Sequence, residues 1–112
     1  MQLDTFHRAI KGFAPELIVK YEDGFYPYGV HSYRGYYEDL AMGAGVKPCT
    51  VKQLLTMLDT DSWIGYKGGH YIRTPATRLW RAEYGDWGDN CGLVVGLMYD
   101  NHTITILTRP EL

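Results

Sequence analysis

The sequence has only two cysteines, Cys49 and Cys91, among its 112 residues. Two cysteines cannot build the multi-bridge framework that holds small secreted domains together. The longest apolar run, residues 93–98, is far shorter than the roughly 20 residues of a membrane-spanning helix. The amino-terminal segment MQLDTFHRAIKGF also lacks the apolar region of a signal peptide. These absences predict a soluble protein of a reducing cytoplasm with no membrane partner.

An excess of charge of either sign is also missing. Eleven basic and 13 acidic residues give a formal net charge of −2. Proteins that bind duplex nucleic acid without sequence preference need a basic surface that neutralises phosphates. A mimic of nucleic acid would instead need a dense acidic surface. The composition argues against both classes and favours a protein or a small molecule as the partner.

The usual signatures of catalytic chemistry are absent from the sequence. Its four histidines are far apart, and no C-x-x-C, H-E-x-x-H or G-x-S-x-G motif occurs. The carboxylate pairs Glu38–Asp39 and Asp59–Asp61 are typical of solvated surface or helix caps rather than of general acid–base catalysis. Cys49 precedes a predicted helix whose amides could activate its thiol, although a small residue accommodated at a helix start is the simpler interpretation. We therefore expect no catalytic residue, no metal and no cofactor.

Tyrosine and glycine are abundant. The chain has ten tyrosines, three tryptophans and 13 glycines, and 46% of its residues are hydrophobic. That apolar content suffices for one packed core, and no linker or repeat interrupts the chain, so we predict a single domain over residues 1–112. The tyrosines fit either a binding surface, where they give amphipathic contact area, or a β-rich domain in which they are strand formers.

A helix over residues 50–59 is the clearest predicted element. Thr50 and Gln53 have the spacing of a capping box. An apolar stripe at positions i, i+3, i+4 and i+7 follows, formed by Val51, Leu54, Leu55 and Leu58. A shorter helix near the amino terminus, with Asp4 or Thr5 as its cap, has Leu3, Phe6 and Ile10 on one face.

Strand patterns and turn signals account for most of the remaining chain. Residues 16–23 and 25–33 are predicted strands, expected to pair as a hairpin, and Pro27 places the second at an edge or a bulge. Residues 34–49 are expected to be irregular. Further strands are predicted over residues 70–73, 78–84 (strand or short helix), 91–99 and 102–108. The sequence thus predicts an α+β fold: an antiparallel sheet with a C-terminal β-hairpin and one main amphipathic helix packed on one face.

Two short motifs are the most distinctive features of the chain. In HSYRGYY, residues 31–37, Arg34 lies among three tyrosines. An arginine beside aromatic planes suits a flat anionic ligand, but an arginine stem can equally cover a tyrosine for structural reasons. In GYKGG, residues 65–69, Lys67 lies among glycines. Such a turn either faces an anion with its amides or uses its glycines for positive φ.

These motifs carry a resemblance to a known group of proteins. The chain resembles small proteins encoded by tailed bacteriophages in HSYRGYYEDLA at 31–41, TV-x-x-LL-x-x-L at 50–58, GYKGG at 65–69, LW at 79–80 and YG at 84–85. The resemblance spans roughly residues 28–108 and transfers no catalytic residue. It implies a host-takeover or anti-defence factor that acts stoichiometrically in the host cytoplasm.

The sequence therefore predicts a non-enzymatic protein that sequesters a small anionic, nucleotide-like signal of host immunity. A pocket shared between subunits would help so small a chain to enclose a ligand, so a homo-oligomer is expected. Two alternatives stay open: an anti-CRISPR-like inhibitor of a host defence protein complex, and an enzyme that acts on a small metabolite. The predicted ligand-binding residues supply ring faces, positive charge and one hydroxyl: Ser32, Tyr33, Arg34, Tyr66, Lys67, Arg73 and Trp80.

Overall fold

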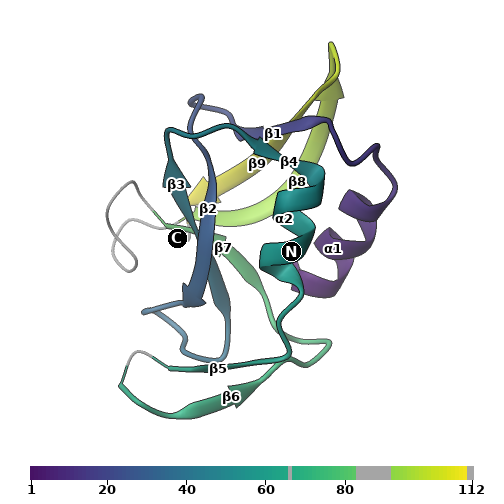
Figure 1. Cartoon of the computed structure of the whole chain (residues 1–112). Coiled ribbons are helices and arrows are strands. Elements are labelled where there is room, and N and C mark those ends of the chain that lie inside the picture. The colour runs from purple at the N-terminus through teal and green to yellow at the C-terminus, as the bar shows by residue number, and fades with distance from the viewer. Residues whose placement is uncertain (66, 83–91, 111–112) are drawn as a thin grey trace.

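The computed structural model describes residues 1–65, 67–82 and 92–110. Over these residues the chain has an α+β fold with two helices and two sheets (Figure 1). Its elements in chain order are α1 (Leu3–Lys11), β1 (Ile18–Tyr21), β2 (Tyr26–Ser32), β3 (Leu40–Gly45), β4 (Cys49–Thr50), α2 (Val51–Leu58), β5 (Ser62–Ile64), β6 (His70–Ile72), β7 (Leu79–Arg81), β8 (Gly92–Asp100) and β9 (Thr103–Pro110).

The main sheet of the described residues is mostly antiparallel, has seven strands and is strongly curled. Its strand order is β2-β3-β7-β8-β9-β1-β4, and the two edge strands, β2 and β4, contact each other. Figure 1 shows α1 and α2 side by side on one side of this curled sheet, and the β5–β6 hairpin apart from it. We call the side that packs on the helices the inner face and the opposite side the outer face.

The inner face holds the main hydrophobic core. Apolar side chains from both helices and from six strands form one buried cluster there. Strand residues alternate between the two faces, as the pleat of a β-strand requires. The largest fully buried members of this core are Leu3, Phe6, Ile10, Tyr21, Leu40, Met42, Leu54, Leu58, Leu79, Ile104 and Ile106.

Both helices begin as their sequences require. In α2 the Gln53 amide donates to Thr50 Oγ1 (3.2 Å) and the Thr50 amide donates to Gln53 Oε1 (2.9 Å), which confirms the capping box. In α1 the N-cap is Gln2, without a side-chain bond, rather than Asp4 or Thr5. The expectation of one main amphipathic helix is not confirmed, because α1 and α2 have nine and eight residues and both bury an apolar face in the same core.

The predicted C-terminal hairpin is confirmed. Strands β8 and β9 pair antiparallel from Gly92–Pro110 to Asp100–Thr103. Asn101 and His102 adopt φ values of 49° and 62°, the primed turn geometry that matches strand twist. The interpretation of Pro27 is also confirmed, since β2 is an edge strand whose register shifts just after Tyr28.

Other sequence predictions about the sheet were wrong. Strand β1 does not form a hairpin with β2 but pairs parallel with β9 and antiparallel with β4. The stretch 34–49, expected to be irregular, contains β3, which pairs with β2 and runs parallel to β7. Nearly every residue of β3 is buried, so its sequence LAMGAG lacks the polar–apolar alternation that marks a half-exposed strand. Residues 83–91, which include the end of the predicted element 78–84 and the start of the predicted strand 91–99, lie outside the described residues.

A buried arginine lies among the apolar side chains of the inner face. The Arg81 side chain is 8% exposed and its Nη2 donates to Asp23 Oδ2 at 2.6 Å. The guanidinium carbon lies 4.2 Å from the centroid of the Tyr21 ring. Burial alone would raise the pKa of Asp23, but hydrogen bonds from Arg81 and from the Phe25 amide outweigh it and lower that pKa. The Asp23 carboxylate therefore balances a charge that the core could not otherwise hold.

Replacing Asp23 with asparagine should destabilise the fold in a pH-dependent way. Because the folded-state pKa lies below its ordinary value of 3.8, the ionised carboxylate contributes stability at neutral pH that is lost as the pH falls through the folded pKa. The Asp23→Asn variant should therefore have a lower free energy of unfolding at pH 7, by an amount that shrinks below about pH 4. Urea unfolding at pH 7 and at pH 3 measures this difference. Glu16→Gln, which changes an exposed carboxyl, is the control. An equal difference at pH 7 and pH 3 would contradict the role of Asp23.

Candidate functional site

A cluster of aromatic and charged side chains lies on the outer face, where the loop 33–39 folds over β7. It consists of Tyr33, Tyr36, Asp39, Arg78 and Trp80, and we call it the aromatic–arginine cluster. The rings of Tyr33 and Trp80 stack with centroids 4.3 Å apart and an interplanar angle of 18°. The ring of Tyr36 is tilted against both, at 5.9 Å from Tyr33 and 6.0 Å from Trp80. Tyr33 and Trp80, together with Ala41 and Ala82, form a second, smaller core on the outer face.

The carboxylate of Asp39 organises this cluster. It is almost fully buried and accepts three hydrogen bonds: from the Arg78 amide (2.8 Å), from Arg78 Nε (3.0 Å) and from Trp80 Nε1 (3.0 Å). The Tyr33 amide donates to the backbone carbonyl of Asp39 at 2.9 Å, which closes the loop. The interpretation of Asp39 as solvated surface or a cap was therefore wrong, whereas Glu38 is exposed as expected.

Arg78 is the charged group that this arrangement presents at the surface. Its guanidinium carbon lies 4.9 Å from the centroid of the Tyr36 ring and 5.0 Å from that of Trp80. Its side chain is 37% exposed, and Tyr36 is 40% exposed. Asp39 takes the Nε–H, which is one of the five N–H donors of a guanidinium. The cluster thus combines a held cation with a partly exposed aromatic side chain, the chemistry that suits a flat anion.

Three of the sequence-predicted residues support the cluster from within. Tyr33 and Trp80 are buried and stacked on each other, so Tyr36 is the most exposed of the three aromatic residues. Ser32 is also buried, and its Oγ donates to the Tyr37 carbonyl at 2.9 Å. These side chains shape the site without being exposed to a ligand.

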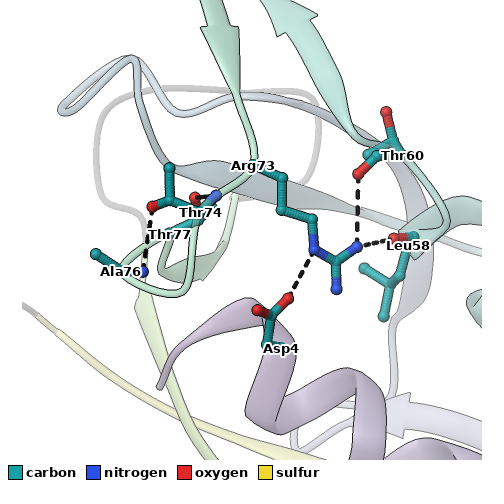
Figure 2. A network of polar contacts seen from close by, with 7 residues as sticks. All are labelled: Asp4, Leu58, Thr60, Arg73, Thr74, Ala76 and Thr77. Atoms are coloured by element: carbon teal, nitrogen blue, oxygen red, sulfur yellow. Dashed lines mark hydrogen bonds and ion pairs between the residues drawn. The ribbon is translucent and has the colours of Figure 1, made fainter.

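Arg73 lies at a different place and has a structural role (Figure 2). Its Nε donates to Asp4 Oδ1 at 2.7 Å, and its Nη1 donates to the Leu58 carbonyl at 2.8 Å and more weakly to the Thr60 carbonyl at 3.5 Å. Its side chain is 14% exposed. Arg73 therefore ties α1, the end of α2 and the end of β6 together through its Nε and Nη1 groups.

Gly65, Lys67, Gly68 and Gly69 of the GYKGG motif lie between the two strands of the β5–β6 hairpin. The Gly65 amide donates to the Gly69 carbonyl at 2.6 Å, and Gly68 has a φ of +93°. A Cβ atom on Gly65 would lie 2.5 Å from the ring of Tyr71. The motif therefore needs glycine for backbone and packing reasons, while Lys67 is exposed on the turn. Tyr66 lies outside the described residues.

The fold brings the segments of the two motifs into contact. Trp63 of β5 donates its indole N–H to the Tyr37 carbonyl at 3.0 Å, and Ser32 Oγ donates to the same oxygen. A Cβ atom on Gly35 would lie 2.6 Å from the Tyr33 ring, so the glycine of SYRG is also required for packing. Arg34 is exposed on the loop that this contact anchors to the β5–β6 hairpin.

Other possible sites give little support to catalytic chemistry. Cys49 is buried, and burial raises the pKa of its thiol to about 11, so the helix start does not activate it. Within residues 1–65, 67–82 and 92–110, no three His, Cys, Asp or Glu side chains are grouped to hold a metal ion. No helix in the same ranges is long and apolar enough to cross a membrane.

The comparisons with known proteins leave the site to be argued from its own geometry. No family model, no curated protein and no solved structure matches the chain. Sequence reasoning missed Tyr36, Asp39 and Arg78, which the structure places in the aromatic–arginine cluster. The available signal in the sequence was weak: Arg78 comes just before Leu79 and Trp80, and Asp39 directly follows Glu38.

Removing the carboxylate of Asp39 should destabilise the fold strongly. In Asp39→Ala the indole N–H of Trp80 and the amide and Nε–H of Arg78 lose their acceptor, which costs about 2–3 kcal/mol of unfolding free energy. Glu38→Ala, which removes the neighbouring exposed carboxylate, should cost less than about 0.5 kcal/mol. Urea unfolding followed by tryptophan fluorescence measures both variants. Equal losses in the two variants would show that Asp39 does not organise the cluster.

Proposed function

We propose that this protein binds a small, planar, negatively charged molecule at the aromatic–arginine cluster and holds it without altering it. The observation that carries the proposal is the position of Arg78, a partly exposed guanidinium held between the Tyr36 and Trp80 rings and the buried carboxylate of Asp39. A cation fixed in this way loses little side-chain entropy when a ligand binds. The preorganised donors favour a phosphate or carboxylate group next to a flat ring system.

A nucleotide-like ligand fits this combination best. Its phosphate would bind the Arg78 guanidinium, and its base would stack on the half-exposed ring of Tyr36. Arg34 lies on the same loop, and Lys67 lies on the hairpin tied to that loop through Trp63. We propose that these two exposed cations supply further charge to the ligand. In this proposal Tyr33, Trp80 and Ser32 support the site rather than contact the ligand.

The biological role that we propose is sequestration of a signalling nucleotide. The two motifs that resemble small tailed-bacteriophage proteins support an anti-defence role, in which the protein removes an immune signal of the host cell. A protein acting in this way binds its ligand stoichiometrically, so affinity rather than turnover determines its effect. The resemblance supports the setting, and the aromatic–arginine cluster supports the ligand chemistry.

Calorimetric titration of the purified protein against cyclic dinucleotides and ADP-ribose derivatives tests this proposal. At least one member of the panel should bind with a micromolar or lower dissociation constant. Tyr36→Ala and Arg78→Gln should each weaken that binding about tenfold or more, equivalent to about 1.4 kcal/mol. Tyr28→Ala and Arg8→Gln are matched controls, because both residues are exposed on other parts of the fold.

Whether the ligand proposal holds depends both on the binding of the nucleotide panel and on the behaviour of the variants. Thermal unfolding of each variant separates loss of binding from loss of fold, since Arg78 also contacts Asp39. If no member of the panel binds at micromolar concentrations, the proposal is wrong. It is also wrong if the control variants weaken binding as much as Tyr36→Ala and Arg78→Gln do.

A stoichiometric inhibitor of a host defence complex is the second candidate function. It is favoured by the β5–β6 hairpin, on which Ile64 and Ile72 are both exposed. Ile64 is paired with His70 and Ile72 with Ser62, so the two isoleucines share one face of the hairpin. Pull-down from a defence-carrying host should then recover one stoichiometric partner, and Ile64→Asp or Ile72→Asp should abolish its capture while Val46→Asp should not. If no partner is recovered, the inhibitor hypothesis is wrong and only the ligand proposal remains.

A further inference from the structure

The outer face of the β8–β9 hairpin carries an exposed apolar patch. Met98 is 53% exposed and is paired with Thr105, and Val95, next to the irregularity in β8, is also exposed. Leu107 is half-buried and follows Thr105 by two residues, so the two side chains share a face. We call Met98 and Leu107, together with the exposed Val95 at the irregularity beside them, the hairpin patch. The helices lie on the opposite face, where Leu97 and Ile106 contact the main core.

Charges of opposite sign lie at the two ends of this patch. Asp100, two residues beyond Met98, is exposed at the tip of the hairpin, which projects beyond the rest of the sheet in Figure 1. Arg109, also exposed, lies at the other end of the hairpin, paired with Leu93. Leu93 packs against the outer-face core around Trp80, which places Arg109 on the outer face as well. The patch therefore runs from a carboxylate through apolar side chains to a guanidinium.

From this arrangement we propose that the hairpin patch is a docking surface for a second copy of this chain. Two hairpins that pack outer face to outer face and run in opposite directions place each Asp100 next to the Arg109 of the other copy. The apolar residues of the two patches then cover one another between these charge pairs. A two-fold symmetric contact forms both pairs at once, because each copy offers the same surface.

Charge favours a second copy over a strongly acidic or basic partner. A surface with one carboxylate end and one guanidinium end is complementary to its own reversed copy, whereas a partner of single charge sign would face repulsion at one end. The net charge of −2 adds little repulsion between copies. The β8–β9 ladder has eight residue pairs, and at about 3.3 Å per position they give a contact roughly 25 Å long, which is small for a stable interface. The dimer should therefore dissociate in the micromolar range.

Sedimentation equilibrium of the full chain over a range of concentrations tests the proposal. The wild type should shift from a mass of 12.8 kDa toward twice that mass as its concentration rises. Asp100→Arg and Arg109→Asp should each raise the dissociation constant at least tenfold, because each places like charges together. The double variant, Asp100→Arg with Arg109→Asp, should restore dimerisation to within a few-fold of the wild type, because the reversed pair is again complementary.

Two further variants separate the patch from general surface effects. Met98→Asp should abolish the dimer, whereas Val46→Asp, at a residue that is 68% exposed on the β3–β4 connection, should not change it. The proposal is overturned if the wild type stays monomeric at several hundred micromolar, if the double variant fails to restore the dimer, or if the patch captures a different protein instead. Calorimetry of the monomeric variants with the nucleotide panel reports ligand binding separately, so the two proposals can fail independently.

Discussion

The buried carboxylate of Asp39 is the interaction on which the outer face depends. It is the shared acceptor that fixes the loop 33–39 to β7, through the amide and Nε–H of Arg78 and the indole N–H of Trp80. With that loop in place, the Tyr33 ring stacks on Trp80, and the Arg78 guanidinium is held beside Tyr36. One buried charge therefore gives both the stability of this region and the arrangement of a cation against aromatic rings that we propose as the ligand site.

Local sequence signals predicted the cap of α2 and the C-terminal hairpin correctly, although they gave the wrong N-cap for α1. The capping box at Thr50 and the primed turn at 101–102 depend on neighbouring residues alone, so the sequence contains everything needed to find them. The parallel pairing of β1 with β9 joins residues 18–21 to residues 103–106, and no local pattern signals such a distant contact. Strand β3 was missed for another reason: its small, buried residues show no alternation.

The candidate site was predictable as a region but not as a set of side chains. The two motifs do lie in segments that contact each other, yet Arg73 is enclosed by Asp4 and backbone carbonyls, while Arg78, five residues later, is partly open. Residue type could not separate these two arginines, because the difference lies in which carboxylate the fold brings to each. The glycines of both motifs make room for tyrosine rings, so part of the distinctiveness of the motifs comes from packing.

The central claim is that the aromatic–arginine cluster itself receives the ligand. The most direct test is a series of ¹H–¹⁵N correlation spectra recorded while a binding nucleotide is added. The account predicts saturable shifts in the Trp80 indole N–H and in the amides of residues 33–39 and 78–81, with the amides of α1 and α2 unchanged. Shifts confined to the helices, or a Trp80 indole signal that stays fixed at saturation, would contradict it.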